Sequence, residues 1–197
     1  MNFEKHVFLL SLIDRLAAVD VPTDRSHIHK SLFLLSEAVV DLVPFTFIYR
    51  SGPYSYDIDE ELSQMRSYAA ITDAAPRNGS AIQEGIVVYR PDQNASLLQK
   101  KHQLPQETLG RIDTLCSFVQ SVGKPPIELD RQATVAWIMR REHIQDASHI
   151  VSRFLELKPN SSRENIEIAL SLVNDWFEKA DQFGKPTASD RAVALAT

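Results

Sequence analysis

The stretch FTFIYRSGPYSYDIDEELSQMRSYA, residues 45–69, decides the fold of this chain. Aromatic residues recur two apart in its first part, so one face of a strand would bury all three rings (Phe45, Phe47 and Tyr49). Gly52 and Pro53 then form a structural turn, because glycine reaches backbone angles that other residues resist and proline fixes the next angle. Straight after this turn, apolar residues at helical spacing predict an amphipathic helix (Ile58, Leu62, Met65 and Ala69).

Composition places the chain among ordinary globular proteins. Its 197 residues are enough for a buried core, and 44% of them are apolar. Cys116 is the only cysteine, which excludes a disulfide framework and fits a reducing cytoplasm. The apolar run at residues 7–13 is too short to span a membrane and lacks a cleavage site, so we expect a cytoplasmic protein with no membrane partner.

The order of the predicted elements indicates a fold class. Two helices open the chain, the strand and helix above follow, and two β-prone runs around Asn78-Gly79 predict a hairpin. This is the element order of a winged helix-turn-helix. The remainder reads as helices, one of them opened by a capping box from Ser161 to Glu164.

We therefore expect a mainly α chain with a small β-sheet, in which a winged-helix-like N-terminal unit packs against a helical C-terminal part. The second helix is predicted to run to residue 42, where Pro44 stops it. The predicted boundaries are 1–93 for the winged unit, 94–183 for the helical part packed on it as one compact body, and 184–197 for a flexible tail.

Several short motifs carry a resemblance to a known family. They are His29-Lys30-Ser31-Leu32-Phe33-Leu34-Leu35, Gly52-Pro53-Tyr54-Ser55, Leu129 to Trp137 and Leu155-Glu156-Leu157-Lys158-Pro159, together with the aromatic strand. With them the chain resembles, over about residues 3–177, the YwgA-like family of bacterial proteins and, more distantly, the Panacea (SocA-like) antitoxin domains. For the Panacea relatives the resemblance implies neutralisation of a toxin through protein contact. For YwgA-like proteins it implies no settled activity, and it carries no catalytic residues across.

Residues 52–56 have two interpretations. A tight turn from strand to helix, capped by Ser55 or Asp57, accounts for them structurally. Alternatively, Tyr54 and Tyr56 stand at the helix start as anchors for a protein partner, a common role of tyrosine at interfaces.

Acidic residues dominate the predicted solvent face of the next helix, which holds Asp57, Asp59, Glu60 and Glu61, with Arg66 further along. In a DNA groove such carboxylates would face phosphates and release no counterions, so this helix is a poor recognition helix. We therefore predict a non-enzymatic protein-binding module, an antitoxin-like or defence-associated protein whose partner is a toxin or an operon neighbour. The predicted contact residues are Tyr54, Tyr56, Asp59, Glu60 and Arg66.

A winged-helix DNA-binding transcription regulator is the alternative. Nucleic acid is disfavoured because residues 1–93 carry nearly all of the net charge of −5. A homodimer would nevertheless pool Arg66, Arg77 and Arg90, with the wing presenting Arg77 to the minor groove.

No metal, cofactor or catalytic set is predicted. Residues two apart on a helix point about 200° from each other, so His27 and His29 cannot both join Asp24 at one ion. His6 has no partner that its spacing identifies. Cys116 lies in a mostly apolar helix, where a thiol belongs to the core.

Overall fold

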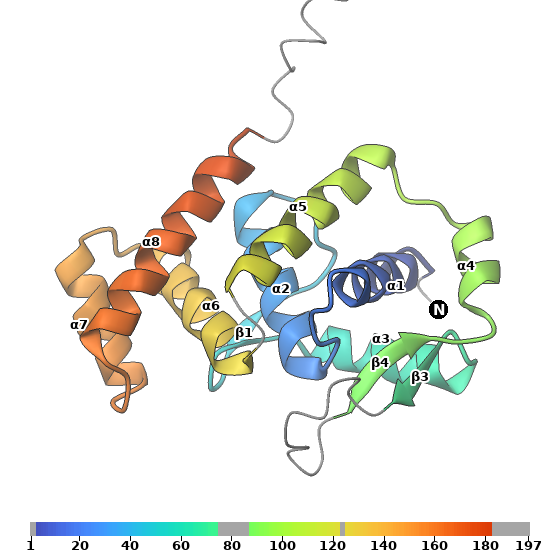
Figure 1. Ribbon diagram of the computed structural model, residues 1–197, viewed down its shortest axis with the longest axis horizontal. Helices are drawn as coiled ribbons and strands as arrows, with labels where there is room; N and C mark the ends of the chain where they lie inside the picture. The colour runs from blue at the N-terminus through green and yellow to red at the C-terminus, as the bar shows by residue number, and fades with distance from the viewer. Residues whose placement is uncertain (1–2, 75–86, 123–124, 183–197) are drawn as a thin grey trace, which may run out of the picture.

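The structure, a computed structural model, describes residues 3–74, 87–122 and 125–182. Within these ranges the chain is mainly α with a small amount of β-structure, as predicted (Figure 1). The helices are α1 (Phe3–Ala18), α2 (Arg25–Ala38), α3 (Tyr56–Ser67), α4 (Ala95–Lys101), α5 (Gln106–Val122), α6 (Pro126–Arg140), α7 (Ala147–Leu157) and α8 (Arg163–Ala180). The strands are β1 (Ile48–Tyr49), β2 (Pro53–Tyr54), β3 (Ile71–Ala74) and β4 (Val88–Pro91). None of these described helices is both long and apolar enough to cross a membrane.

Helix α2 lies at the centre of the hydrophobic core. It packs against α5, α6, α8 and β2, and Figure 1 shows it in the middle of the helices. Apolar residues cover most of its circumference, which is typical of a helix buried on several sides (Ile28, Leu32, Phe33, Leu34 and Leu35). The indole Nε1 of Trp176 in α8 donates a buried hydrogen bond of 3.1 Å to the Leu34 carbonyl. Helix α8 is therefore hydrogen-bonded directly to α2.

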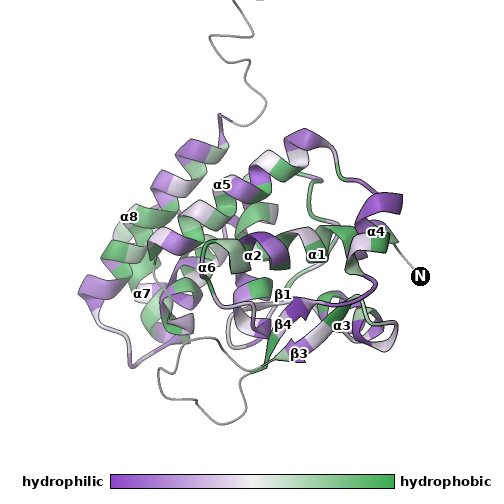
Figure 2. Ribbon diagram, turned by 45° about the vertical axis from the view of Figure 1, so that its right-hand side comes forward, coloured by the Kyte–Doolittle hydropathy of each residue, from purple (hydrophilic) through white to green (hydrophobic). Residues whose placement is uncertain are grey.

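One hydrophobic core extends through both halves of the chain. Helix α1 packs on α3, α4 and α5, while α6 packs on α2, α7 and α8. Figure 2 shows hydrophobic residues mainly on the sides of the helices that face the interior and hydrophilic residues mainly on the sides that face outward. Cys116 belongs to this core as predicted: it is 1% exposed, and burial raises the pKa of its thiol to about 12.

Within the described ranges the β-structure forms two separate two-stranded sheets. Strands β3 and β4 pair antiparallel, from Ile71 opposite Pro91 to Ala74 opposite Val88. Asp24, just before α2, forms a further bridge with Val88. The segment between β3 and β4, which includes Arg77 and the predicted wing, lies outside the described residues.

The aromatic strand is shorter than predicted. Phe45 and Phe47 are buried, but the strand contains only Ile48 and Tyr49. The prediction of a strand that begins at residue 45 is therefore wrong. The two rings are buried by helices instead of by strand pairing. The Phe47 ring meets Phe33 of α2 edge-on at 5.4 Å between centroids, and the Lys5 ammonium of α1 lies 5.2 Å from the Phe45 ring.

The ends of the helices follow local chemistry closely. Asp24, Ser55 and Asp146 each accept a backbone N–H at the start of α2, α3 and α7, so that of the two caps considered for α3, Ser55 and not Asp57 is the cap. Two predictions are wrong. Helix α2 ends at Ala38 and not at residue 42, because Val39 is extended. The cap of α8 is Ser162 and not Ser161, because the Ser162 hydroxyl accepts the N–H three residues further on.

Candidate functional site

The turn between β1 and β2 depends on Gly52. Its φ of 139° lies in a region that residues with side chains rarely adopt. The Arg50 N–H donates to the Gly52 carbonyl at 3.0 Å and closes the turn, while Pro53 pairs with Tyr49 in the ladder. The predicted structural turn is therefore present, but it joins two strands of a hairpin before α3 begins.

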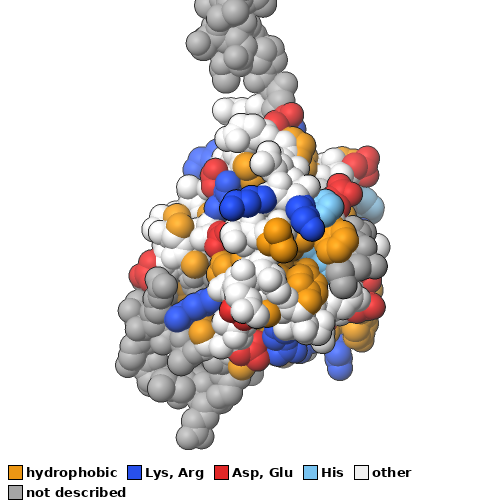
Figure 3. Space-filling model, turned by 90° about the vertical axis from the view of Figure 1, so that its right-hand side faces the viewer, with side chains coloured by type: hydrophobic (Ala, Val, Ile, Leu, Met, Phe, Trp, Pro, Cys, Tyr) orange, Lys and Arg blue, Asp and Glu red, His pale blue; other side chains and the backbone are white. Residues whose placement is uncertain are grey.

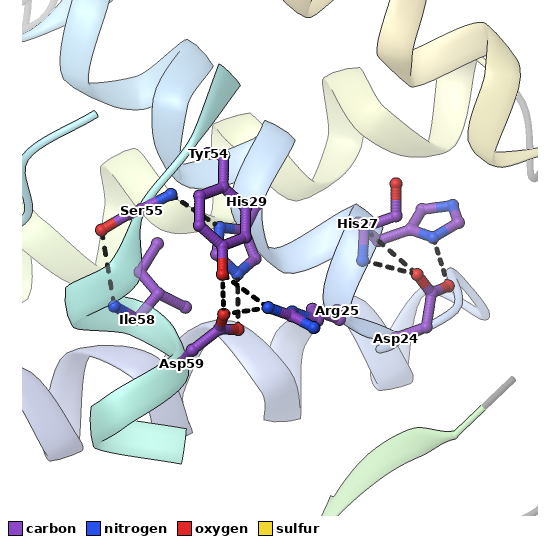
Figure 4. Close-up of polar contacts among 9 residues, drawn as sticks. Asp24, Arg25, His27, His29, Tyr54, Ser55, Ile58 and Asp59 are labelled. Carbon is purple, nitrogen blue, oxygen red and sulfur yellow. Dashed lines mark hydrogen bonds and ion pairs between the residues drawn. The ribbon is translucent and has the colours of Figure 1, made fainter. Parts of the chain in front are cut away.

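Tyr54 leaves this hairpin and enters a polar network that three elements share (Figure 4). Its hydroxyl donates to Asp59 of α3, and Arg25 of α2 donates both to that hydroxyl, at 2.6 Å, and to the Asp59 carboxylate. The Tyr54 ring also stacks on the His29 ring, with centroids 4.7 Å apart and an interplanar angle of 5°. Hydrogen bonds and stacking together fix the position of Tyr54.

His29 of α2 binds the start of α3 through both of its ring nitrogens. Nδ1 accepts the backbone N–H of Ser55 at 3.1 Å, so the proton of the neutral ring is on Nε2. Nε2 then donates to Asp59 at 3.1 Å. His27 faces the other way and pairs with Asp24 at 2.5 Å, which agrees with the prediction that the two histidines point apart.

Burial and hydrogen bonding set the charges of this network. Burial lowers the pKa of His29 to about 4, although Asp59 acts in the opposite direction, so the ring is neutral near pH 7. Burial raises the pKa of Asp59, but hydrogen bonds from Tyr54, Arg25 and His29 outweigh it and leave this pKa below its ordinary value. The network therefore contains one cation, Arg25, beside one anion, Asp59.

An exposed surface, which we name the tyrosine patch, covers this network and consists of Ile48, Arg50, Tyr54 and Tyr56. Tyr56 is 59% exposed and Ile48 is 45% exposed. Ile48 lies opposite Tyr54 in the ladder, so their side chains share one face of the hairpin. The Tyr56 ring meets Tyr54 edge-on at 5.0 Å, and the Arg50 guanidinium lies 6.0 Å from the Tyr54 ring. The predicted anchors Tyr54 and Tyr56 thus lie together.

The prediction that four acidic residues share the solvent face of α3 is wrong for two of them, Asp59 and Glu61. Asp59 is bonded inside the Tyr54 network, and Glu61 is 8% exposed. Glu61 accepts from His6 of α1 at 2.5 Å, because α3 packs on α1 and turns this position inward. Asp57 lies 3.8 Å from Lys5 of α1. Glu60 remains exposed to solvent as predicted, and the Asp57 side chain is 40% exposed.

His6 therefore has a partner that its sequence spacing did not reveal. Besides Glu61, it contacts the Tyr68 hydroxyl through Nδ1 at 2.8 Å. Burial lowers the pKa of His6 more than the attraction of Glu61 raises it. His6, Glu61 and Tyr68 therefore form a buried polar link between α1 and the end of α3.

Two arginines of the DNA alternative, Arg66 and Arg90, lie on another part of the structure, while Arg77 is outside the described residues. Arg66, at the end of α3, pairs with Asp73 of β3 at 2.9 Å. Arg90 lies in β4 opposite Thr72. Both lie near the β3–β4 sheet and outside the tyrosine patch.

A second polar cluster joins the hairpin turn to the C-terminal helices. Asp130 of α6 binds Lys158, which follows α7, and lies 3.7 Å from Lys30 of α2. The Lys158 ammonium also donates to the Ser51 carbonyl at 3.1 Å. Burial, reinforced by Lys158, lowers the pKa of Lys30 although Asp130 opposes the shift. The motifs that carry the family resemblance supply Lys30, Asp130 and Lys158, but their spacing did not predict this meeting.

A shallow groove of about 250 Å³ opens beside this cluster, between the start of α6 and the α7–α8 connection. Lys158 belongs to both the cluster and the groove. The groove is lined by Ile127, Asp130, Arg131, Lys158, Pro159, Asn160 and Ser161.

Another exposed apolar surface lies where α4 meets the start of α1. Phe3 is 39% exposed and Leu97 is 51% exposed, and the Phe3 ring stacks on His102 at 4.9 Å. Figure 3 shows this side of the molecule, with hydrophobic side chains beside lysine, arginine and histidine side chains. The tyrosine patch differs from it because the Tyr54 hydroxyl donates to Asp59 of α3 and accepts from Arg25 of α2, which fixes the Tyr54 ring.

The described residues contain no group of three or more His, Cys, Asp or Glu side chains placed to hold a metal ion. Comparison with models of protein families and with curated proteins found no match to this chain, so its likeness to YwgA-like and Panacea proteins stays a prediction from the motifs quoted above.

Proposed function

We propose that this chain is a non-enzymatic protein-binding module whose contact surface is the tyrosine patch. The observation that supports it best is the exposure of Tyr56 and Ile48 beside a Tyr54 ring that is already fixed. Tyrosine and arginine carry much of the binding energy at protein interfaces. Side chains that are ordered before binding lose less conformational entropy when a partner arrives.

The partner that we propose is a toxin or another product of the same operon, bound in the manner of an antitoxin. The fold class agrees with this proposal, and the resemblance of the motifs motivates it. Binding would occur in the cytoplasm without a cofactor.

Co-purification with each neighbouring gene product tests this function. We expect one neighbour to co-purify with the wild-type chain and to be toxic when it is expressed without the chain. Tyr56→Ala and Ile48→Ser should weaken this complex at least about tenfold, because a central aromatic or aliphatic anchor contributes on the order of 2 kcal/mol.

Ile168→Ser is the matched control, since Ile168 is 51% exposed on α8 and lies outside the tyrosine patch. It should leave the complex unchanged. If the chain stays alone at micromolar concentration with every neighbour, and no neighbour is toxic without it, the proposed function is wrong.

DNA binding remains a second candidate because the acids of α3 are largely neutralised. With Asp59 and Glu61 in internal pairs, the exposed residues of α3 are mostly uncharged or paired. The bridge between Asp24 and Val88 adds a strand-like segment ahead of α2, as a winged helix-turn-helix would have. In that arrangement α3 would be the recognition helix.

A mobility shift on the upstream DNA of the gene tests this candidate. Binding that weakens with salt and is lost in Arg77→Glu would favour it. The absence of any shift at low salt would exclude it, and would leave protein binding unaffected.

A further inference from the structure

A row of cations runs from the tyrosine patch across the hairpin turn to the groove beside α6. Arg25 and Arg50 lie 5.3 Å and 6.0 Å from the Tyr54 ring. Lys158 reaches the Ser51 carbonyl at the turn and also lines the groove, where Arg131 is the next cation. We name this row, formed by Arg25, Arg50, Lys158 and Arg131, the basic track.

The basic track has an excess of positive charge. Its four cations lie among three carboxylates, namely those of Asp59, Asp130 and Glu128, while Lys30 behind it is attracted by both Asp130 and Asp24. Arg50 is exposed and, among the residues that the structure describes, has no carboxylate within ion-pair distance. The excess is notable because the whole chain has a net charge of −5. A charged partner would therefore meet a local surface opposite in sign to the rest of the chain.

Apolar side chains lie at both ends of the basic track. Ile48 and Tyr56 are exposed at the hairpin end. At the other end Ile127 is 57% exposed and lines the groove together with Pro159. Apolar side chains and positive charges therefore alternate along this surface. Such an arrangement suits a polypeptide that carries both apolar and charged side chains.

We infer that the basic track binds an acidic segment of a partner protein, with carboxylates on Arg50 and Lys158 and apolar side chains on the tyrosine patch and in the Ile127 groove. This inference rests on the proposed function and adds the chemistry of the partner. Nucleic acid fits less well, because Asp59, Asp130 and Glu128 lie among the cations and would repel a continuous row of phosphates. Single carboxylates can instead pair with single cations.

Fluorescence anisotropy with defined peptides tests this inference. The probes are a labelled peptide of Glu-Glu-Leu repeats, a matched peptide of Lys-Lys-Leu repeats and a labelled DNA duplex. We expect the glutamate peptide to bind the full chain, more weakly as salt is raised, and the lysine peptide not to bind. Arg50→Glu should weaken binding of the glutamate peptide roughly tenfold, because it replaces an attraction with a repulsion.

Asn160→Glu supplies a second variant at the other end of the basic track. Asn160 is an exposed loop residue that lines the groove, so the change leaves the core intact while it adds a negative charge. It should also weaken binding of the glutamate peptide. Lys101→Glu is the matched control, because Lys101 is exposed on α4, which lies apart from the basic track in Figure 1.

Several outcomes would overturn the inference: no binding of the glutamate peptide at low salt, equal binding of the lysine peptide, or equal affinity of the wild type and Arg50→Glu. Binding of the DNA duplex that depends on Arg50, without binding of the glutamate peptide, would identify nucleic acid as the ligand instead. Failure here is distinguishable from failure of the proposed function. If Tyr56→Ala abolishes co-purification of a neighbour but Arg50→Glu does not, the proposed protein binding stands and the inferred acidic segment is ruled out.

Discussion

Gly52 touches Asp130 across the two halves of the chain: a Cβ atom at position 52 would lie 2.6 Å from the Asp130 Oδ1 atom. A side chain here would have to displace the Asp130 carboxylate, which is bonded to Lys158, and the Lys30 Cε atom would lie 3.5 Å from the same Cβ position. The backbone conformation at φ 139° and this close contact together favour glycine at residue 52, where the hairpin turn meets α2 and α6. The contact also places the basic track over the junction between the N-terminal and C-terminal helices.

Gly52→Ala should lower the free energy of unfolding by about 3 kcal/mol, because it combines backbone strain with a steric clash. Urea denaturation measures this loss. Gly110→Ala is the control, since Gly110 lies in α5 with no atom within 4 Å of its Cβ position. The control should be about 1 kcal/mol more stable than wild type, as alanine favours the helix. Equal stability of the two variants would contradict this account of the turn.

The two aspartate caps should differ in their contribution to stability. Asp24 accepts the N–H groups of Ser26 and His27 and also pairs with the buried His27 ring. Asp24→Ala should therefore cost about 3 kcal/mol, because it removes the cap and leaves a buried polar ring without this acceptor.

Asp146→Ala removes a cap at the exposed start of α7, where the carboxylate accepts the His149 N–H at 2.9 Å. We expect a smaller loss of stability than at Asp24, because this cap lies at an exposed helix start. Thermal or urea unfolding of both variants makes the comparison. A larger effect at Asp146 than at Asp24 would show that the buried pair with His27 adds nothing.

His29 should make the folded state less stable in mild acid. Its pKa is about 4 in the folded chain and 6.5 in an unstructured peptide, so only the unfolded chain takes up a proton between these values. Its contribution is complete above pH 6.5 and is lost as the pH falls to 4, a loss of about 3 kcal/mol.

Urea unfolding from pH 7 to pH 4 measures this effect. The wild type should lose stability more steeply than His29→Gln, whose side chain does not titrate. His149→Gln is the control, because the His149 side chain is 77% exposed. A His29 ring that titrates near pH 6.5 by NMR would refute the prediction.

The thiol of Cys116 should react only when the protein unfolds. Burial closes the site to reagents and raises its pKa to about 12, so thiolate is scarce at pH 8. Alkylation of the native protein at pH 8 should therefore be slow and should accelerate at the urea concentrations that unfold the chain. Ser117→Cys places an exposed thiol on the next residue of α5 and should react at once. Equally fast labelling of both would show that Cys116 is accessible.

The fold class could be predicted because it depends on local patterns. Helical periodicity and caps such as Asp146 identify most helices, since these signals lie within a few residues of one another. The length of β1 was mispredicted for a physical reason. Burial two residues apart is typical of a strand, but packing of Phe45 and Phe47 on helices produces the same pattern without a ladder.

The candidate site could be predicted only in part. Tyr54 and Tyr56 are adjacent to the Gly52 turn, so their position at the helix start follows from the sequence alone. The partners of Asp59 and Glu61 lie on other helices, at Arg25 and His6, and local sequence spacing does not predict such pairs. For this reason the sequence overestimated the free acidity of α3.

The hydrogen bond from Trp176 to the Leu34 carbonyl links positions 142 residues apart and so affects how the chain folds during synthesis. Until α8 has left the ribosome, the apolar side of α2 that it covers has no partner and stays open to solvent. Folding should therefore be slow for a helical protein and should depend on protection of the nascent chain, because distant contacts close late.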